Sequence, residues 1–171
     1  MLSRRFLLAA TAALALAPTF AFAEDHPEVF HVHDAYARSM GGVGASGAVF
    51  MMLHNNGATD DRLIGAKGDV AQKLELHTHK MTDDGVMQML EIEGGVPMPA
   101  GEMHSFERGA DHVMLMGLTR ELRDGDSFPL TLVFESGAEM TFDVVVDNAR
   151  KTGEATMDME GVDHSTMDMG N

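Results

Sequence analysis

Apolar and polar residues alternate along most of this 171-residue chain, in short segments separated by glycine, proline, asparagine and aspartate. A period of two places successive side chains on opposite faces of an extended strand. No stretch keeps the longer period of an amphipathic helix. The pattern predicts strands at residues 29–38, 48–55, 60–66, 72–80, 86–92, 103–107, 112–118, 128–135 and 139–147. Short strands at such close spacing predict an all-β sandwich or barrel.

Turn residues divide these segments and predict how two of them pair. Asp84 and Gly85 are typical of a tight hairpin turn, which would set residues 74–81 antiparallel to residues 86–92. Glycines and prolines at 94–99 predict a bend before the next strand. The glycine-rich segment 40–47 lacks the Lys-Ser/Thr ending of a phosphate-binding loop, so we interpret it as a connection without a phosphate role.

The two ends of the chain depart from the strand pattern. Arg4 and Arg5, an apolar run and the small residues 21–23 are typical of a signal peptide, residues 1–23. Paired arginines fit an ordinary leader and a twin-arginine leader alike. The run is too short for a permanent membrane helix, so no membrane anchor is expected. Residues 24–150 would form one domain, and residues 151–171 a disordered extension with little apolar mass besides methionine.

Charge and composition narrow the class of partner. The formal charge is −15, and it becomes −17 once Arg4 and Arg5 leave with the signal. This acidity argues against nucleic acid or an anionic membrane as a partner. The chain has no cysteine, which excludes disulfides and thiolate metal sites, but it has 16 methionines. A thioether is a soft metal ligand that needs no deprotonation.

Histidine or methionine occupies every second position in parts of three predicted strands. The residues are His77, His79, Met81, Met87, Met89, His112, Met114 and Met116. Alternate residues share one face of a strand, and the predicted hairpin would make the first two sets cross-strand neighbours. Imidazole and thioether ligands without a thiolate suit copper(I) best, so we expect these faces to converge on a copper(I) ion.

The chain also resembles a known family. The resemblance rests on six blocks in this order: Asp60–Leu63, Glu75–His77, Gly85–Met89, Gly94–Gly95, Pro99–Gly101 and His112–Leu118. Together they are similar to the periplasmic copper(I) chaperones associated with assembly of the cytochrome c oxidase copper centres. The resemblance covers residues 29–146 and implies a cupredoxin-like β-sandwich.

The resemblance implies a ligand set for copper(I) in the core domain. The family pattern falls on His77, Met89, His112 and Met114, with Met87 as the alternative to Met89 and His79 as a neighbouring candidate. Because these ligands are neutral, a shallow site could release the ion to a more anionic thiolate site. The implied partners are the copper-bearing subunit of cytochrome c oxidase and thiol-containing copper assembly factors, and no catalytic residue is expected.

Further copper ligands are candidates outside this set. Family members with a similar extension imply a second copper, as copper(I) or copper(II), on Met157, Met159, His164, Met167 and Met169. His26 would be the third residue after signal cleavage, where it could chelate copper(II), with His31 and His33 on the following strand. We interpret His54 and His104 as structural or surface residues.

Two other functions fit the same residues. A passive periplasmic copper buffer or resistance protein would use the same ligands without a specific client. A zinc enzyme would hold an activated water with His77, His79 and His112, and would leave the methionines as packing. We expect a periplasmic copper carrier that is not an enzyme.

Overall fold

The structure, a computed structural model, describes residues 29–82 and 84–151. This part of the chain contains ten strands and no helix that is long and apolar enough to cross a bilayer. The strands are β1 (Phe30–Ser39), β2 (Gly47–Asn55), β3 (Asp61–Lys67), β4 (Ala71–Met81), β5 (Met87–Glu91), β6 (Val96–Met98), β7 (Met103–Phe106), β8 (His112–Leu118), β9 (Ser127–Phe134) and β10 (Glu139–Val146). The predicted signal peptide lies outside the described residues, as does nearly all of the predicted extension.

All nine predicted strands are present, with ends that shift by at most one residue. The tenth strand, β6, is not predicted, because the glycines and prolines at 94–99 indicate only a bend. Pro97 lies in the middle of β6 and cannot donate a backbone hydrogen bond. It is accommodated because, among the described strands, β6 ends the strand order and pairs with β3 alone. An edge strand leaves one row of backbone groups unpaired.

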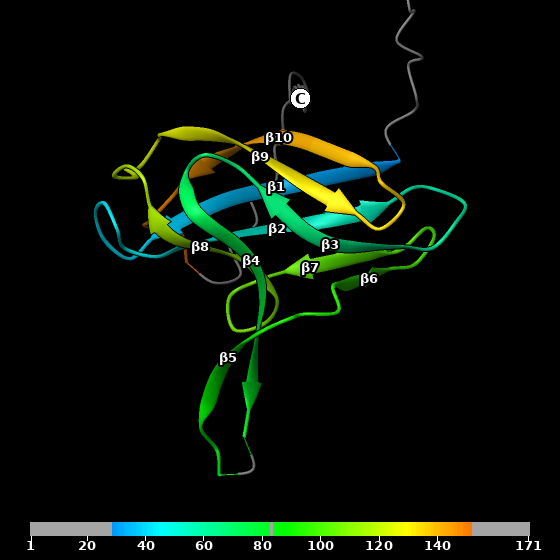
Figure 1. Ribbon diagram of the computed structural model, residues 1–171, viewed down its shortest axis with the longest axis horizontal. Coiled ribbons are helices and arrows are strands. Elements are labelled where there is room, and N and C mark those ends of the chain that lie inside the picture. The colour runs from blue at the N-terminus through cyan, green and yellow to red at the C-terminus, as the bar shows by residue number, and fades with distance from the viewer. Residues whose placement is uncertain (1–28, 83, 152–171) are drawn as a thin grey trace, which may run out of the picture.

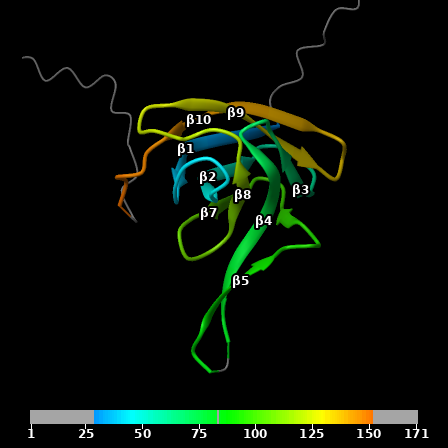
Figure 2. The same cartoon turned by 60° about the vertical axis from the view of Figure 1, so that its left-hand side comes forward.

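The strands form one curled sheet in the order β5-β4-β8-β2-β1-β10-β9-β3-β6. β7 lies off this path and pairs with the second half of β2, whereas β8 pairs with the first half. Neighbouring strands are antiparallel except β1 and β10, which run parallel. Figure 1 shows β9 and β10 on one side of the body and β7 and β6 on the other. Figure 2 shows the same arrangement after rotation, with β2 between β1 and β7, both of which pair with it. The predicted all-β class is confirmed.

The core lies between the layers and fixes which residues of each strand face outward. Val49, Met51 and Leu53 of β2 are buried in it with the alternate residues of β9, and Phe30 stacks on Phe134 with ring centroids 3.6 Å apart. Burying each such side chain contributes about 1.5–3 kcal/mol. Because side chains alternate, residues 48, 50, 52 and 54 of β2 face away from this core.

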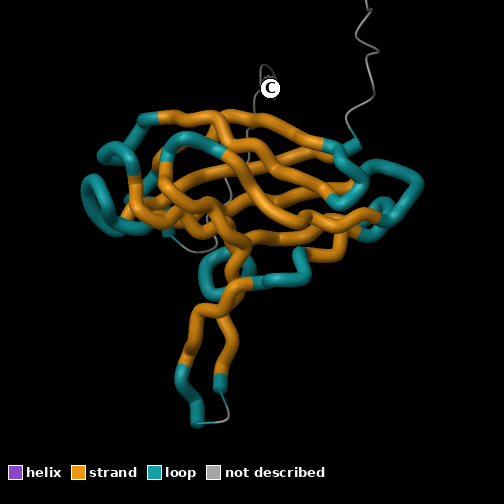
Figure 3. Tube along the Cα trace, viewed as in Figure 1, coloured by secondary structure: helices purple, strands orange, loops and turns teal. Residues whose placement is uncertain are grey.

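The hairpin of β4 and β5 projects beyond the body of the sheet (Figures 1 and 3). Its pairing is the predicted one, with Met81 opposite Met87 next to the turn. The Thr82 N–H donates to the Val86 carbonyl over 2.9 Å, and Gly85 adopts a positive φ of 77° in the turn. The first half of β4 pairs with β8 in the body, so this strand connects the hairpin to the sheet.

Candidate metal centre

Strand register brings the three predicted histidine and methionine sets onto one face. His77 of β4 lies directly opposite His112 of β8, and His79 lies opposite Met89 of β5. Met114 follows two residues after His112 and lies opposite Glu75. Directly opposite residues in antiparallel strands point to the same face, so these side chains form one continuous surface across β5, β4 and β8.

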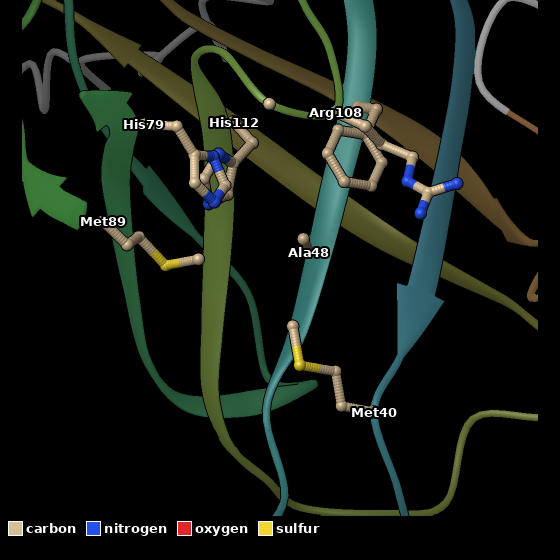
Figure 4. A pocket seen from close by; sticks show the side chains of 8 residues that line it. Met40, Ala48, His79, Met89, Arg108 and His112 are labelled. Carbon is tan, nitrogen blue, oxygen red and sulfur yellow. The ribbon is translucent and has the colours of Figure 1, made fainter. Parts of the chain in front are cut away.

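A cavity of about 380 Å³ opens on this face. Its lining residues are Met40, Ala48, Phe50, His79, Met89, Arg108, Gly109 and His112. Figure 4 shows the imidazoles of His79 and His112 side by side, and their ring centroids are 5.1 Å apart. The Met89 thioether points into the same space, with Met40 across from it (Figure 4). His77 and Met114 lie on the same face but do not line the cavity.

The environment of His112 favours a neutral imidazole, with one ring nitrogen in a hydrogen bond to the backbone. Its side chain is buried, with 1% of the residue exposed, and its Nδ1–H donates to the Ala110 carbonyl over 3.0 Å. Burial lowers the pKa of His112 below its usual value, and nearby His79 and His77 lower it further, against the opposing effect of the Ala110 hydrogen bond. The lone pair therefore lies on Nε2, in the form that binds a metal.

His77 has a similar arrangement, with a carboxylate as its acceptor. Its Nε2–H donates to Glu75 over 2.8 Å, and Glu75 also pairs with Lys73. Hydrogen bonds from Lys73 and then His77 lower the pKa of Glu75, so its carboxyl group stays ionised. A carboxylate that accepts from one imidazole nitrogen fixes the tautomer and leaves the other nitrogen for a metal.

Two buried imidazole nitrogens lack a hydrogen-bond partner among the described residues. They are Nδ1 of His77 and Nδ1 of His79. Buried polar atoms are nearly always satisfied, and one without a partner calls for an explanation such as a missing ion or water. His77 and His79 each lie beside His112, at ring centroid distances of 6.1 and 5.1 Å, and each distance fits an ion bound between that histidine and His112. With metal–nitrogen bonds of about 2 Å, two imidazoles on one ion have centroids roughly 5–6.5 Å apart.

The donor set fits copper(I) better than zinc. Within residues 29–82 and 84–151, no group of three or more histidine, aspartate or glutamate side chains could hold a metal ion. The geometry therefore does not support the three-histidine zinc site. Imidazoles supplemented by thioethers match the ligand preference of copper(I), which imposes little geometry on its ligands.

The structure distinguishes the two methionines of β5. Met89 lies opposite His79 and lines the cavity, whereas Met87 lies opposite Met81, one row nearer the hairpin tip. Met114 is more deeply placed, with 8% of the residue exposed, between Glu75 of β4 and Ala48 of β2 in the register. The geometry thus favours Met89 over Met87 as a ligand. Met114 is buried on the same face, outside the cavity lining.

Five residues of the cavity wall are not among the predicted site residues, namely Met40, Ala48, Phe50, Arg108 and Gly109. Met40 comes from the glycine-rich segment that we interpret as a simple connection, and its N–H donates to the Ser46 carbonyl over 2.9 Å. Arg108 comes from the turn before β8. No spacing rule marks either residue, because each reaches the cavity through a loop. The predicted candidates His26, Met157, Met159, His164, Met167 and Met169 lie outside the described residues.

Fold and site together define an all-β domain with an open imidazole and thioether cavity. The chain belongs to the family described as "Putative lipoprotein LpqE-like", whose sequence profile matches residues 30–146. A protein of Leifsonia xyli subsp. xyli, named "Putative lipoprotein Lxx21020", is 34% identical over 91 residues, which make up 53% of this chain. The match covers 54% of that protein, so the chain spans about half of its length.

Solved structures share the fold. The apo PCuAC domain from PmoF1 superposes with a TM-score of 0.58 at 24% identity, covering 70% of this chain and 93% of that domain. The copper-bound PCuAC domain from PmoF2 gives 0.56 at 21%, covering 70% and 92%. The copper(I) form of DR1885 from Deinococcus radiodurans gives 0.53 at 26%, covering 72% and 83%. The predicted cupredoxin-like β-sandwich is confirmed.

Proposed function

We propose that this protein is a periplasmic copper(I) carrier that binds the ion on the face shared by β4, β5 and β8. The observation that carries the proposal is the pairing of His77 with His112. Each donates one ring N–H to a protein oxygen, at 2.8 Å and 3.0 Å, and keeps its other nitrogen for a metal. The similar protein DR1885 is known in a copper(I) form, which supports the choice of ion.

The proposed ligands are His77, Met89, His112 and Met114, with His79 at the mouth of the cavity. His77 and His112 are held by their acceptors, and Met89 reaches the cavity from the opposite strand of the hairpin. His79 would receive the ion first because it lines the cavity, whereas His77 does not. All five side chains are neutral as ligands, so the bound ion keeps its positive charge.

Release to a partner follows from that charge and from the open cavity. A thiolate compensates the charge of copper(I) and binds it more strongly than thioether or neutral imidazole, so transfer to a thiolate site is downhill. We propose the copper-bearing subunit of cytochrome c oxidase and thiol-containing copper assembly factors as recipients. The lipoprotein names of the family and of the Leifsonia relative support export of the chain.

A competition titration with a copper(I) chelator tests the binding site. The mature chain should bind one equivalent of copper(I) tightly, and this binding should shift the His112 ring resonances. His112→Gln should weaken the affinity by tenfold or more. His104→Gln is the matched control, because His104 bonds to Asp111 at 2.9 Å and does not line the cavity. Equal affinity of the His112 variant and the natural protein would contradict the assignment.

A second experiment separates a carrier from a passive buffer. A strain without the gene should lose cytochrome c oxidase activity at low copper and regain it when copper is added. Copper sensitivity with normal oxidase activity would instead identify a buffer or resistance protein. In vitro, the copper-loaded chain should transfer its ion to the reduced dithiol of an oxidase copper subunit, with no transfer in reverse.

We also propose that the C-terminal extension binds a second copper through Met157, Met159, His164, Met167 and Met169. The proposal rests on the soft side chains of that segment. Replacing these methionines by leucine and the histidine by glutamine in the full chain should remove one equivalent and leave the shift of His112 intact. An unchanged stoichiometry would contradict it.

A further inference from the structure

A second row of soft metal ligands crosses three strands away from the cavity. His31 of β1 lies directly opposite His54 of β2, and His54 lies directly opposite Met103 of β7. Opposed residues of antiparallel strands share a face, with Cβ atoms about 4.5–5.5 Å apart. Two imidazoles and a thioether therefore stand side by side, with His54 in the middle.

The adjoining row adds two more donors on the same face. His33 of β1 lies opposite Met52 of β2, which lies opposite Ser105 of β7. Because residues two apart on a strand are about 7 Å apart along it, the rows are within reach of long side chains. We call this surface the β1–β2–β7 patch. Its members are His31, His33, Met52, His54 and Met103.

The side chains of the patch are not part of the hydrophobic core. β2 points Met51 and Leu53 into the core, both at most 2% exposed, and Met52 and His54 away from it. Met103 is 58% exposed, although an exposed thioether gains little from packing. A half-exposed position on a sheet face usually carries a polar or charged side chain, whereas this face carries imidazoles and thioethers.

A hydrogen bond to the backbone fixes the tautomer of one imidazole of the patch, that of His54. The His54 Nε2–H donates to the Gly101 carbonyl over 3.3 Å, so the lone pair of the neutral ring lies on Nδ1. A backbone carbonyl that accepts from the far nitrogen is the usual support of a metal-binding histidine. The Nδ1 lone pair of His54 is therefore available to a metal, next to the side chains of His31 and Met103 in the same row.

We propose that the β1–β2–β7 patch binds a copper(I) ion of its own, with His31, His54 and Met103 as ligands. The combination of neutral imidazole and thioether selects a soft monovalent ion, and three ligands suffice for copper(I) because it imposes little geometry. The patch is distinct from the cavity: on β2, His54 is four residues beyond Phe50, which lines the cavity, a separation of about 13 Å. One sheet face thus presents two copper(I) sites, one at each end of β2.

Methionine-methyl and histidine-ring NMR of the full mature chain tests the proposal, with silver(I) as a redox-inert probe of the copper(I) site. The Met103 methyl and the ring carbons of His31 and His54 should shift together as silver(I) is added, and the shifts should saturate. The Met89 methyl reports the cavity in the same spectra. Silent Met103 and His54 signals after the Met89 signal has saturated would overturn the proposal.

Two variants test whether this silver(I) ion binds at the β1–β2–β7 patch. Met103→Leu should weaken this equivalent by about tenfold or more and abolish the shift of His54, while the Met89 shift stays the same. Met140→Leu removes a thioether from β10, where Met140 lies opposite Leu132 of β9, and should change neither equivalent. Because Met103 is exposed, its replacement leaves the fold intact. A His54 shift that persists unchanged in Met103→Leu, or appears equally with zinc(II), would overturn a thioether-containing copper(I) site.

Discussion

His77 of β4 lies directly opposite His112 of β8, with ring centroids 6.1 Å apart, and each imidazole donates a hydrogen bond away from the other. The acceptors are Glu75 on one side and the Ala110 carbonyl on the other. Both tautomers are therefore set before any ion binds. This preorganisation reduces the ordering cost of copper binding.

The carboxylate of Glu75 should support copper binding through His77. Glu75→Gln removes the ionised acceptor, so the imidazole loses its charge-assisted hydrogen bond and part of its basicity as a ligand. We expect copper(I) affinity to fall by about tenfold, measured by chelator competition at neutral pH. Glu91→Gln is the matched control, because Glu91 is exposed directly opposite His77 on β5. Equal losses of affinity in both variants would mean that the effect comes from the change in net charge and not from the hydrogen bond to His77.

Met89 should be the methionine ligand of β5. It lines the cavity, whereas Met87 lies nearer the hairpin tip and is 49% exposed. We expect Met89→Leu to weaken copper(I) binding by tenfold or more, since leucine has similar volume and no donor atom, and Met87→Leu to change it less than threefold. The same chelator competition measures both. The reverse order would assign the ligand to Met87.

The apoprotein should lose stability on mild acidification because of His112. Burial lowers its folded-state pKa below the usual 6.5, so the unfolded chain takes up the proton first as the pH falls. Stability from this group is complete above about pH 6.5 and decreases below it, by up to about 1.4 kcal/mol per pH unit, until the folded-state pKa is reached. Urea unfolding between pH 7.5 and 5 should show this slope, and His112→Gln should reduce it. An identical slope in the variant would contradict the effect.

Asn55 should be important for the stability of β2. Its amide is buried, donating to the carbonyls of Met98 at 2.8 Å and Thr59 at 3.0 Å and accepting from the Gly57 N–H at 2.9 Å. Asn55→Ala leaves these backbone groups unsatisfied, which we expect to cost about 1–3 kcal/mol in the free energy of unfolding. Denaturant unfolding measures it, with exposed Asn56→Ala as the control. A variant as stable as the control would mean that water replaces the amide.

The β4–β5 hairpin and the neighbouring strand β6 show how far a local sequence pattern predicts the structure. The hairpin from Leu74 to Ile92 is predictable because a tight turn and two alternating segments are close in sequence. The edge strand β6 is not, because Pro97 is tolerated only at an edge and the edge is defined by where β3 lies. Likewise Met40 reaches the cavity through a loop that carries no periodic signal.

The sequence alone is enough to predict nine of the ten described strands, the hairpin, the absence of thiolate ligands and the faces that carry histidine and methionine. Each of these depends on residue type or on neighbours a few positions away, which a period of two records. The pairing of His77 with His112 becomes visible only in the fold, as does the row formed by His31, His54 and Met103. Register between strands distant in sequence depends on how the whole core packs, and no local period encodes it.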